Sequence, residues 1–264
     1  MRRRDALVLA ALALYAAPAL WQALTSLVPD ADLLAPARWR PWTLTLEHYR
    51  AVLTQSPMPR ALLNSAVVAV LTAVLAVALG TLAGYALARL PVPGRRGILL
   101  GIVLSTAFPA VATVAPLYLI VRALGLRDTW WALVLADTSF ALPLATWLVT
   151  GFVRELPPAL EEAAFVDGAG RLGALRHVVL PAIAPGAAAA GLLAFLFAWN
   201  ELLFAYTFTA TEASRTAPVA LALFPGVFET PWGDVAAAAA PGAMAGSTTW
   251  RRAPRRPAPS TKAA

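Results

Sequence analysis

The chain has 264 residues, of which 59% are apolar and only 13% are charged. Soluble domains typically have about 45–50% apolar and about 25% charged residues. A soluble protein of this length could not easily bury so much apolar surface, whereas lipid can replace a buried core, so the composition favours a membrane protein.

The formal net charge of +7 comes largely from the end of the chain. Five cations and no acid follow residue 250: Arg251, Arg252, Arg255, Arg256 and Lys262. Charge confined to a short tail disfavours a nucleic-acid-binding face, so no nucleic-acid partner is expected. The chain has no cysteine and no GxxxxGK[ST] phosphate loop, which excludes disulfides and makes ATP hydrolysis by this chain unexpected. His48 and His177 lie too far apart in sequence for a local metal motif.

Long runs almost free of charge predict membrane-spanning helices, because about 20 helical residues cross the hydrocarbon core. The first run, at about residues 6–27, has the basic start of a secretory signal, but its apolar part exceeds the usual length of about 7–15 residues. We therefore interpret it as a retained helix rather than a cleaved signal. Four more spans are predicted at about residues 61–88, 97–121, 129–153 and 187–210.

Residues 235–249 form a sixth candidate that is too short to assign. A helix over these 15 residues would be about 22 Å long, against about 30 Å of hydrocarbon. Pro241 would also break that helix near its middle. Residues 250–264 read as a disordered basic tail by composition. The expected fold class is an all-α membrane protein, a bundle of five transmembrane helices plus the unassigned sixth.

Arginines in the short loops orient this bundle with its N-terminus in the cytoplasm. The longest cytoplasmic loop is then 154–181, which predicts two short helices with a glycine corner. The first begins at Pro157-Pro158, where a helix needs no N–H donor, and stops at Gly168 in a left-handed turn. The second is expected to end at Pro181. Such a knob between two spans is suited to contact a soluble partner.

This loop resembles the EAA loop of ATP-binding-cassette importer permeases, which reads E-A-A, three residues, G, nine residues, I-x-L-P. The chain has Glu162-Ala163-Ala164, then Gly168 and Val178-x-Leu180-Pro181 at that spacing, with Val178 for Ile as the departure. Asn64-Ser65, Gly84 to Arg89 and Phe195 to Glu201 are also similar to carbohydrate-type permeases, most of all to the shorter permease of maltose- and trehalose-type systems. The resemblance covers about residues 5–240 and implies one permease domain, residues 1–240.

The resemblance implies a subunit of a sugar importer in a bacterial-type inner membrane, for a di- or oligosaccharide. Its partners would be a second permease, two ATPase subunits that bind the EAA loops from the cytoplasm, and an extracytoplasmic sugar-binding protein. No catalytic residue, metal or cofactor is implied for this chain. The residues implied to couple to the ATPase are Glu161, Glu162, Ala163, Ala164, Asp167, Gly168, Leu180 and Pro181.

For most of the other polar residues, the sequence leaves two interpretations open. Trp199, Asn200 and Glu201 are candidates for lining the sugar path, because sugars need hydrogen-bond partners; the alternative is a structural tie between helices. Asp137 has no assigned role. Three basic residues of the loop either contact the ATPase or are solvated: Arg171, Arg176 and His177.

Two rival classes fit less well. A secondary transporter usually has two similar halves, and the sequence shows no internal repeat. An intramembrane enzyme would need a catalytic set, and Asp137 and Glu201 belong to no paired motif. Permeases of the resembled kind carry a sixth span before a short cytoplasmic end. Because a basic tail stands there instead, we expect a truncated permease with weak or absent transport and with the tail outside or at the interface.

Overall fold

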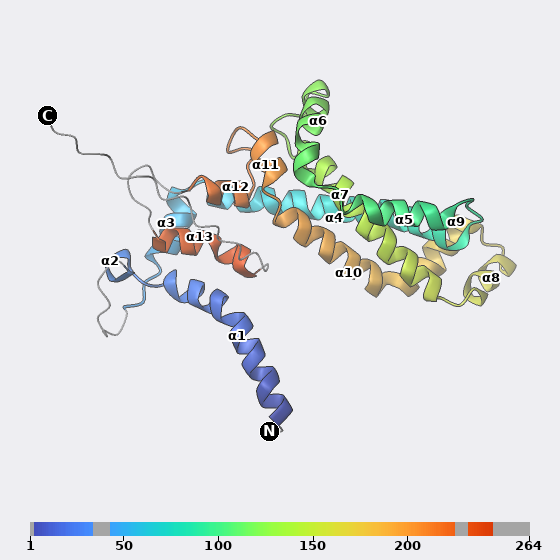
Figure 1. Cartoon of the computed structure of the whole chain (residues 1–264), viewed down its shortest axis with the longest axis horizontal. Helices are drawn as coiled ribbons and strands as arrows, with labels where there is room; N and C mark the ends of the chain where they lie inside the picture. The colour runs from blue at the N-terminus through green and yellow to red at the C-terminus, as the bar shows by residue number, and fades with distance from the viewer. Residues whose placement is uncertain (1–2, 34–42, 225–231, 245–264) are drawn as a thin grey trace.

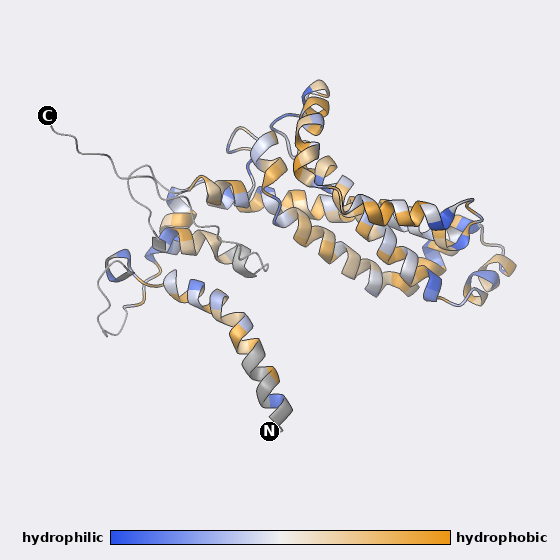
Figure 2. Cartoon of the chain, in the orientation of Figure 1, coloured by the Kyte–Doolittle hydropathy of each residue, from blue (hydrophilic) through white to orange (hydrophobic). Residues whose placement is uncertain are grey.

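The structure is a computed structural model that describes residues 3–33, 43–224 and 232–244. Every regular element in these residues is a helix. Figure 1 shows a long bundle of α4 (Met58–Arg89), α7 (Trp130–Glu155) and α10 (Leu180–Trp199), with α1 (Arg3–Thr25) standing apart from it. Figure 2 shows that these long helices are mostly apolar, as helices surrounded by lipid must be.

The centre of the bundle is the contact between α4 and α7, where small residues let the two backbones come close. A Cβ added at Gly80 would lie 3.0 Å from the Ala145 Cβ, and one added at Gly84 would lie 3.0 Å from the Thr150 nitrogen. Gly80 meets Ala145 and Gly84 meets Thr150, so the two helices run in the same direction. Glycines at this spacing permit close packing inside a membrane.

The predicted helix end at Pro181 is wrong. α9 (Arg171–Ala174), a π-helical turn η1 (Leu175–Val179) and α10 follow one another without a break, and together they form one apolar helix of 29 residues. Proline lacks an N–H and its ring crowds the carbonyl four residues earlier. The π turn, in which the Leu180 N–H donates to the Leu175 carbonyl, widens the helix just before the proline and accommodates it.

The segment predicted as a span at 97–121 is not one continuous helix, and whether it crosses the membrane stays a prediction. α5 (Arg95–Ser105) and α6 (Ala110–Ala123) meet at an angle of 94°. The hydroxyls of Ser105 and Thr106 donate to the carbonyls of Ile102 and Val103, at 2.7 Å each, and so compete with continuation of the helix. Pro109 then removes an N–H and disfavours a helical conformation at the residue before it.

Among the residues that the structure describes, three helices are long and apolar enough to cross a membrane, or four if the bent pair counts as one span. The three single helices correspond to the predicted spans at 61–88, 129–153 and 187–210. The last of these is shifted, because its long helix ends at Trp199 and a short α11 (Leu203–Phe208) follows. The first predicted span coincides with α1, which has 23 residues. A bundle of five spans stays a prediction.

The remaining short helices lie near the start of α4: α2 (Asp30–Leu33), α3 (Glu47–Gln55), α12 (Ala217–Ala222) and α13 (Trp232–Met244). Residues Val235 to Ala239 of α13 are buried. His48 of α3 holds α13 in place, because its Nδ1 lies 2.8 Å from the Asp234 carboxylate. The helix continues through Pro241, so the prediction that this proline breaks it is wrong. The rest of the sixth candidate, 245–249, and the basic tail lie outside the described residues.

Candidate functional site

The predicted coupling loop lies at one end of the bundle, where α8 (Ala159–Val166) follows the end of α7 (Figure 1). α8 starts after Pro158, as the sequence predicts, because the first turn of a helix needs no N–H from proline. It is terminated at Gly168, whose φ of +85° is a left-handed conformation that glycine adopts without strain. The Ala169 N–H then donates to the Ala164 carbonyl at 2.9 Å and closes the turn. This part of the loop prediction is confirmed.

α8 has one face turned to solvent and one turned to its own chain. The solvent face carries Glu162 and Ala163 together with two large apolar side chains, Phe165 at 43% exposure and Val166 at 88%. Asp167 and Gly168 are exposed as well, while Ala164 is half-buried. Glu162, Phe165 and Val166 thus form the continuous exposed face that their helical spacing predicts.

Glu161 lies at the edge of this face that is turned toward α4, with only 6% of its surface exposed. One carboxylate oxygen accepts a hydrogen bond from the Arg89 Nε at 2.5 Å, and the other accepts one from the Tyr85 hydroxyl at 3.0 Å. The Arg89 Nη2 also donates to the Leu156 carbonyl at the end of α7, at 2.7 Å. Tyr85 and Arg89 belong to a segment that the sequence comparison singled out, but no role was assigned to them there.

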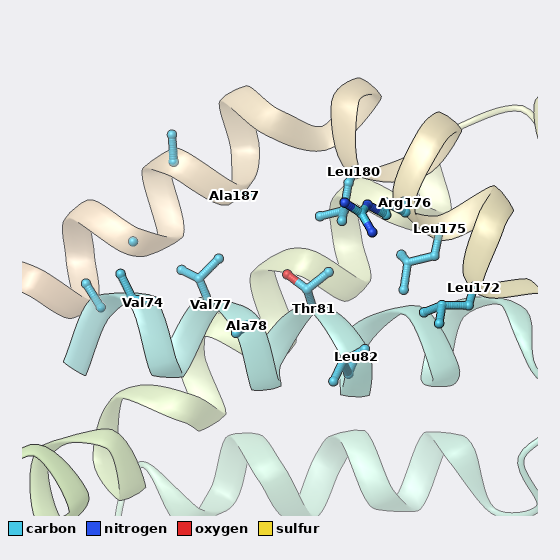
Figure 3. Close-up of a pocket in the computed structure, with 13 residues that line it drawn as sticks. Val74, Val77, Ala78, Thr81, Leu82, Leu172, Leu175, Arg176, Leu180 and Ala187 are labelled. Carbon is cyan, nitrogen blue, oxygen red and sulfur yellow. The ribbon is translucent and has the colours of Figure 1, made fainter. Parts of the chain in front are cut away.

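The two outermost residues of the predicted motif, Leu180 and Pro181, lie on the long helix and not on the knob. Leu180 lines an apolar groove of about 710 Å³ between α4 and the α9–α10 helix. Figure 3 shows Val77 and Thr81 of α4 facing Leu175 and Leu180 across this groove. The motif is therefore divided between the exposed helix α8 and the interior of the continuous helix Arg171–Trp199.

The basic residues of the loop are exposed, and Arg176 lies at the end of that groove. His177 is also exposed, and its Nδ1–H donates to the Gly173 carbonyl at 3.0 Å, with the tautomer assigned from this contact. Within the described residues, no group of three or more His, Cys, Asp or Glu side chains is arranged to hold a metal ion.

The candidate path residues lie at the other end of α10, where the structure gives each of them a partner in the same chain. The Glu201 carboxylate accepts hydrogen bonds from the backbone N–H groups of Phe204 at 2.8 Å and Ala205 at 2.9 Å, so it caps α11. The Asn200 amide donates to the Leu196 carbonyl at 2.8 Å. The Trp199 ring stacks on Phe195, with centroids 5.6 Å apart. These contacts are local to α10 and the start of α11, so neither the sugar path nor a tie between distant helices follows from them, and the path role stays a prediction.

Asp137 lies in the same part of the bundle and is 2% exposed. Its Oδ1 has no hydrogen-bond partner within the described part of the chain. The α4–α7 register, in which position 76 lies beside 141 and position 80 beside 145, places Thr72 opposite it. The Thr72 hydroxyl is likewise buried without a partner among the described residues. The structure therefore assigns Asp137 to the interior of the α4–α7 contact.

A second cluster of polar contacts, which the sequence reading missed, surrounds residues 209–216 at the start of α4. The Asn64 amide donates to the carbonyls of Ala213 at 3.1 Å and Arg215 at 2.8 Å. The Ser65 hydroxyl accepts a hydrogen bond from the Ala217 N–H at 2.8 Å. Asn64-Ser65 was recognised only as part of a family pattern, because no local spacing shows that an asparagine will bind a loop 150 positions away.

Asp128 holds the same loop from the α6–α7 connection. Its carboxylate accepts hydrogen bonds from the Ala210 N–H at 2.7 Å, from the Thr211 N–H and hydroxyl at 3.0 and 2.7 Å, and from the Ser214 hydroxyl. Burial raises the pKa of the Asp128 carboxyl, but these hydrogen bonds to the charged form outweigh burial and hold the pKa well below its usual range. Asp128 has a φ of +62°, which its sequence neighbours do not reveal.

Comparisons with known proteins agree with this architecture. The family model described as "Binding-protein-dependent transport system inner membrane component" matches residues 76–239. The trehalose transport system permease protein SugB of Mycobacterium tuberculosis is 45% identical over 224 residues, which are 84% of this chain and 81% of that protein. The sulfoquinovosyl glycerol transport system permease protein SmoH of Agrobacterium fabrum is 42% identical over 84% of this chain and 78% of its own.

A trehalose/maltose transport system permease protein, MalG of Thermococcus litoralis, is 36% identical over 84% of this chain and 80% of its own length. Among solved structures, a bacterial ABC transporter involved in the import of the acidic polysaccharide alginate matches with a TM-score of 0.75. It covers 91% of this chain and 90% of its own, at 21% identity, and so supports the fold alone. The chain therefore belongs to the family of membrane-embedded permeases that are the inner-membrane components of binding-protein-dependent, ATP-binding-cassette transport systems.

Proposed function

We propose that this chain forms half of the transmembrane path of a sugar importer and that α8 is the surface bound by a partner ATPase. The observation that carries the proposal is the solvent face of α8, where Phe165 and Val166 are exposed beside Glu162 at the end of the bundle. A short helix that holds large apolar side chains in water, outside the spans, has the character of an interaction surface. Hydrolysis of ATP belongs to the partner, and the chain itself uses no cofactor.

The names of the relatives support a sugar as substrate. They include permeases for trehalose, for trehalose and maltose, and for sulfoquinovosyl glycerol. All three substrates contain a glycosidically linked sugar, so we propose a di- or oligosaccharide or a glycoside of similar size. A second permease subunit would form the other half of the path, and an extracytoplasmic binding protein would deliver the sugar.

Charge supports an orientation with the α8 end, and the N-terminus, in the cytoplasm. Figure 2 shows hydrophilic residues gathered at this end of the bundle. Basic residues near the membrane favour the cytoplasmic side. Those carried by the helix ends and turns here are Arg89, Arg95, Arg96, Arg154, Arg171 and Arg176.

The test is expression of the tagged full chain together with its neighbouring transport genes. We expect an ATPase and a second permease to co-purify, and the reconstituted complex to take up labelled trehalose or maltose only with ATP inside and binding protein outside. The variant Val166→Lys places a charge on the solvent face of α8 and should release the ATPase. Leu124→Lys, at another exposed apolar position that is far from α8, should not. Retention of the ATPase by Val166→Lys, or uptake without ATP, would contradict the proposal.

Orientation is measured separately with single cysteines, because the chain has no cysteine of its own. Val166→Cys should react with a membrane-impermeant maleimide only after the membrane is opened, and Glu212→Cys should react in intact cells. The reverse pattern would place α8 outside and exclude an ATPase contact there.

A further inference from the structure

Glu161 and Glu162 are neighbours in sequence, but their side chains differ in exposure, because successive residues of a helix point about 100° apart. Glu162 is exposed on the proposed partner face, whereas Glu161 is 6% exposed and is the only buried residue among those of α8. Both Glu161 carboxylate oxygens are occupied within the chain, by Arg89 and Tyr85. Glu161 therefore has neither the exposure nor the free oxygen that a contact with another subunit would need.

The group that holds Glu161 also joins three helices. Arg89 is the last residue of α4, and it donates to Glu161 of α8 at 2.5 Å and to the Leu156 carbonyl at the end of α7 at 2.7 Å. Tyr85, one turn earlier on α4, donates to the second Glu161 oxygen at 3.0 Å. The ends of α4 and α7 are in turn packed together by Tyr85, Val149 and Val153.

Apart from this group, α8 contacts α9 and η1. It has no buried apolar side chain within the described structure, and the turns at its two ends contain Pro157-Pro158 and Gly168. Because a helix without a buried apolar side chain gains little from these contacts, the buried charge pair is its strongest connection to α4 and α7. Arg89 and Glu161 side chains are only 16% and 7% exposed, so solvent screens their attraction little.

We propose that Arg89, Glu161 and Tyr85 form a mechanical joint that transmits displacement of α8 to the ends of α4 and α7. The joint rests on the proposed function of α8, and it makes Arg89 and Glu161 positioning residues that touch neither the sugar nor the ATPase. A buried ion pair contributes little net stability, since desolvation offsets most of the attraction, but it fixes a geometry. Because the joint lies apart from the exposed residues Glu162 and Val166, its loss should leave the ATPase contact in place and let α8 move without the spans.

The joint is tested first in the full chain alone, in lipid nanodiscs. Spin labels at Val166→Cys on α8 and Leu82→Cys on α4, both exposed, report the distance between the two helices. We expect a narrow distance distribution in the parent, a broad one in Arg89→Glu and in Glu161→Arg, and a narrow one again in the Arg89→Glu/Glu161→Arg double variant. Glu155→Arg reverses an exposed acid near the joint and should leave the distribution narrow.

The same variants are then measured in the complete transporter. Each single reversal should retain the ATPase but lower the sugar taken up per ATP hydrolysed by roughly tenfold, and the swap should restore most of it, as a direct pairwise coupling requires. Because the swap restores a charge pair without restoring either residue, a general loss of folding would not give this pattern.

Each outcome separates the joint from the proposed function. An unchanged distance distribution in both single reversals, or a swap that fails to narrow it, overturns the joint whatever the transporter does. Release of the ATPase by Glu161→Arg, as expected for Val166→Lys, also overturns it, because Glu161 would then be a contact residue. If the swap restores the distance but the ATPase does not bind through α8, the contact between the helices stands. The proposed role of α8, and the transmission through the joint, would then be wrong.

Discussion

The two ends of α4 are held in different ways. At its start, Asn64 and Ser65 bind backbone groups of the 209–217 segment, and Asp128 binds the same loop from the other side. At its end, Arg89 and Tyr85 bind one side chain, Glu161, on a helix whose outer face is exposed.

This difference bears on movement. A loop held by many hydrogen bonds to its backbone can shift only by losing several of them together, and each buried group left unpaired costs about 1–3 kcal/mol. A helix connected through one side chain, by an ion pair and a hydrogen bond, can be displaced together with the end of α4 while both contacts stay intact. The start of α4 is therefore built to stay fixed and the end to follow α8.

The largest effect is expected in the contact between α4 and α7, which lies between the two ends of α4. Gly84→Leu would place a Cβ 3.0 Å from the Thr150 nitrogen and 3.0 Å from the Val149 side chain, and backbone atoms cannot rotate away. We expect a loss of about 3 kcal/mol, the upper end for an overpacked contact, and poor recovery of folded protein. Gly97→Leu, where a Cβ meets nothing within 4 Å, is the matched control. Equal melting temperatures for the two variants in detergent would show that α4 and α7 do not form a rigid pair.

The sequence predicts the local features of this fold better than the contacts between distant segments. Pro158, Gly168 and the long charge-free runs act through neighbouring residues, so the bounds of α8 and the spans near 61–88 and 129–153 follow from them. Pro181 led to the wrong prediction of a helix end, because the π turn formed by the residues before it accommodates a proline inside the helix. The bend before Pro109 depends likewise on two hydroxyls that favour it together.

The candidate site shows the same limit. Nothing in the order Glu161-Glu162 tells which carboxylate will face Arg89, seventy-two positions earlier, since both lie in the first turn of one helix. Glu201 is the one charged residue of the segment 182–211, which made it a candidate for the sugar path, yet its carboxylate caps the short α11. Contacts between distant segments decide these roles, and one sequence does not contain them.

The second prediction loosens the start of α4. Asn64→Leu keeps a similar volume but removes the amide that donates to Ala213 and Arg215, in a site with 0% exposure. We expect a loss of about 2 kcal/mol, because buried carbonyls lose their donor. Hydrogen exchange should accelerate at the amides of residues 210–217 and stay unchanged in α8. Faster exchange in both places would mean that the two ends of α4 are not held independently.

The third prediction uses pH at the same loop. The pKa of Asp128 is lowered in the folded chain, so its carboxylate adds stability at pH values above its ordinary pKa of about 3.9. That stability is lost as pH falls below this value toward the lower folded pKa. We expect the melting temperature of the parent to exceed that of Asp128→Asn at pH 7, and the gap to narrow between about pH 4 and pH 3. A gap that is independent of pH would show that the charge is not what holds the loop.

The smallest effect is expected at the end of α4, where Tyr85→Phe removes one hydroxyl from the joint and leaves the Arg89–Glu161 pair in place. Loss of this hydrogen bond should cost about 1.5 kcal/mol, the lower end for a charged acceptor, and the ring that packs with Val149 and Val153 is kept. Sugar uptake per ATP should therefore fall by roughly twofold to fivefold, less than for either charge reversal. Tyr206→Phe, on a ring that is 58% exposed on α11, removes the same atom far from the joint and should change nothing. If Tyr85→Phe lowers uptake as much as Glu161→Arg, then the hydroxyl rather than the ion pair sets the position of α8. In that case the ion pair is not the main contact at the end of α4, and the description of this end as held by a charge pair fails.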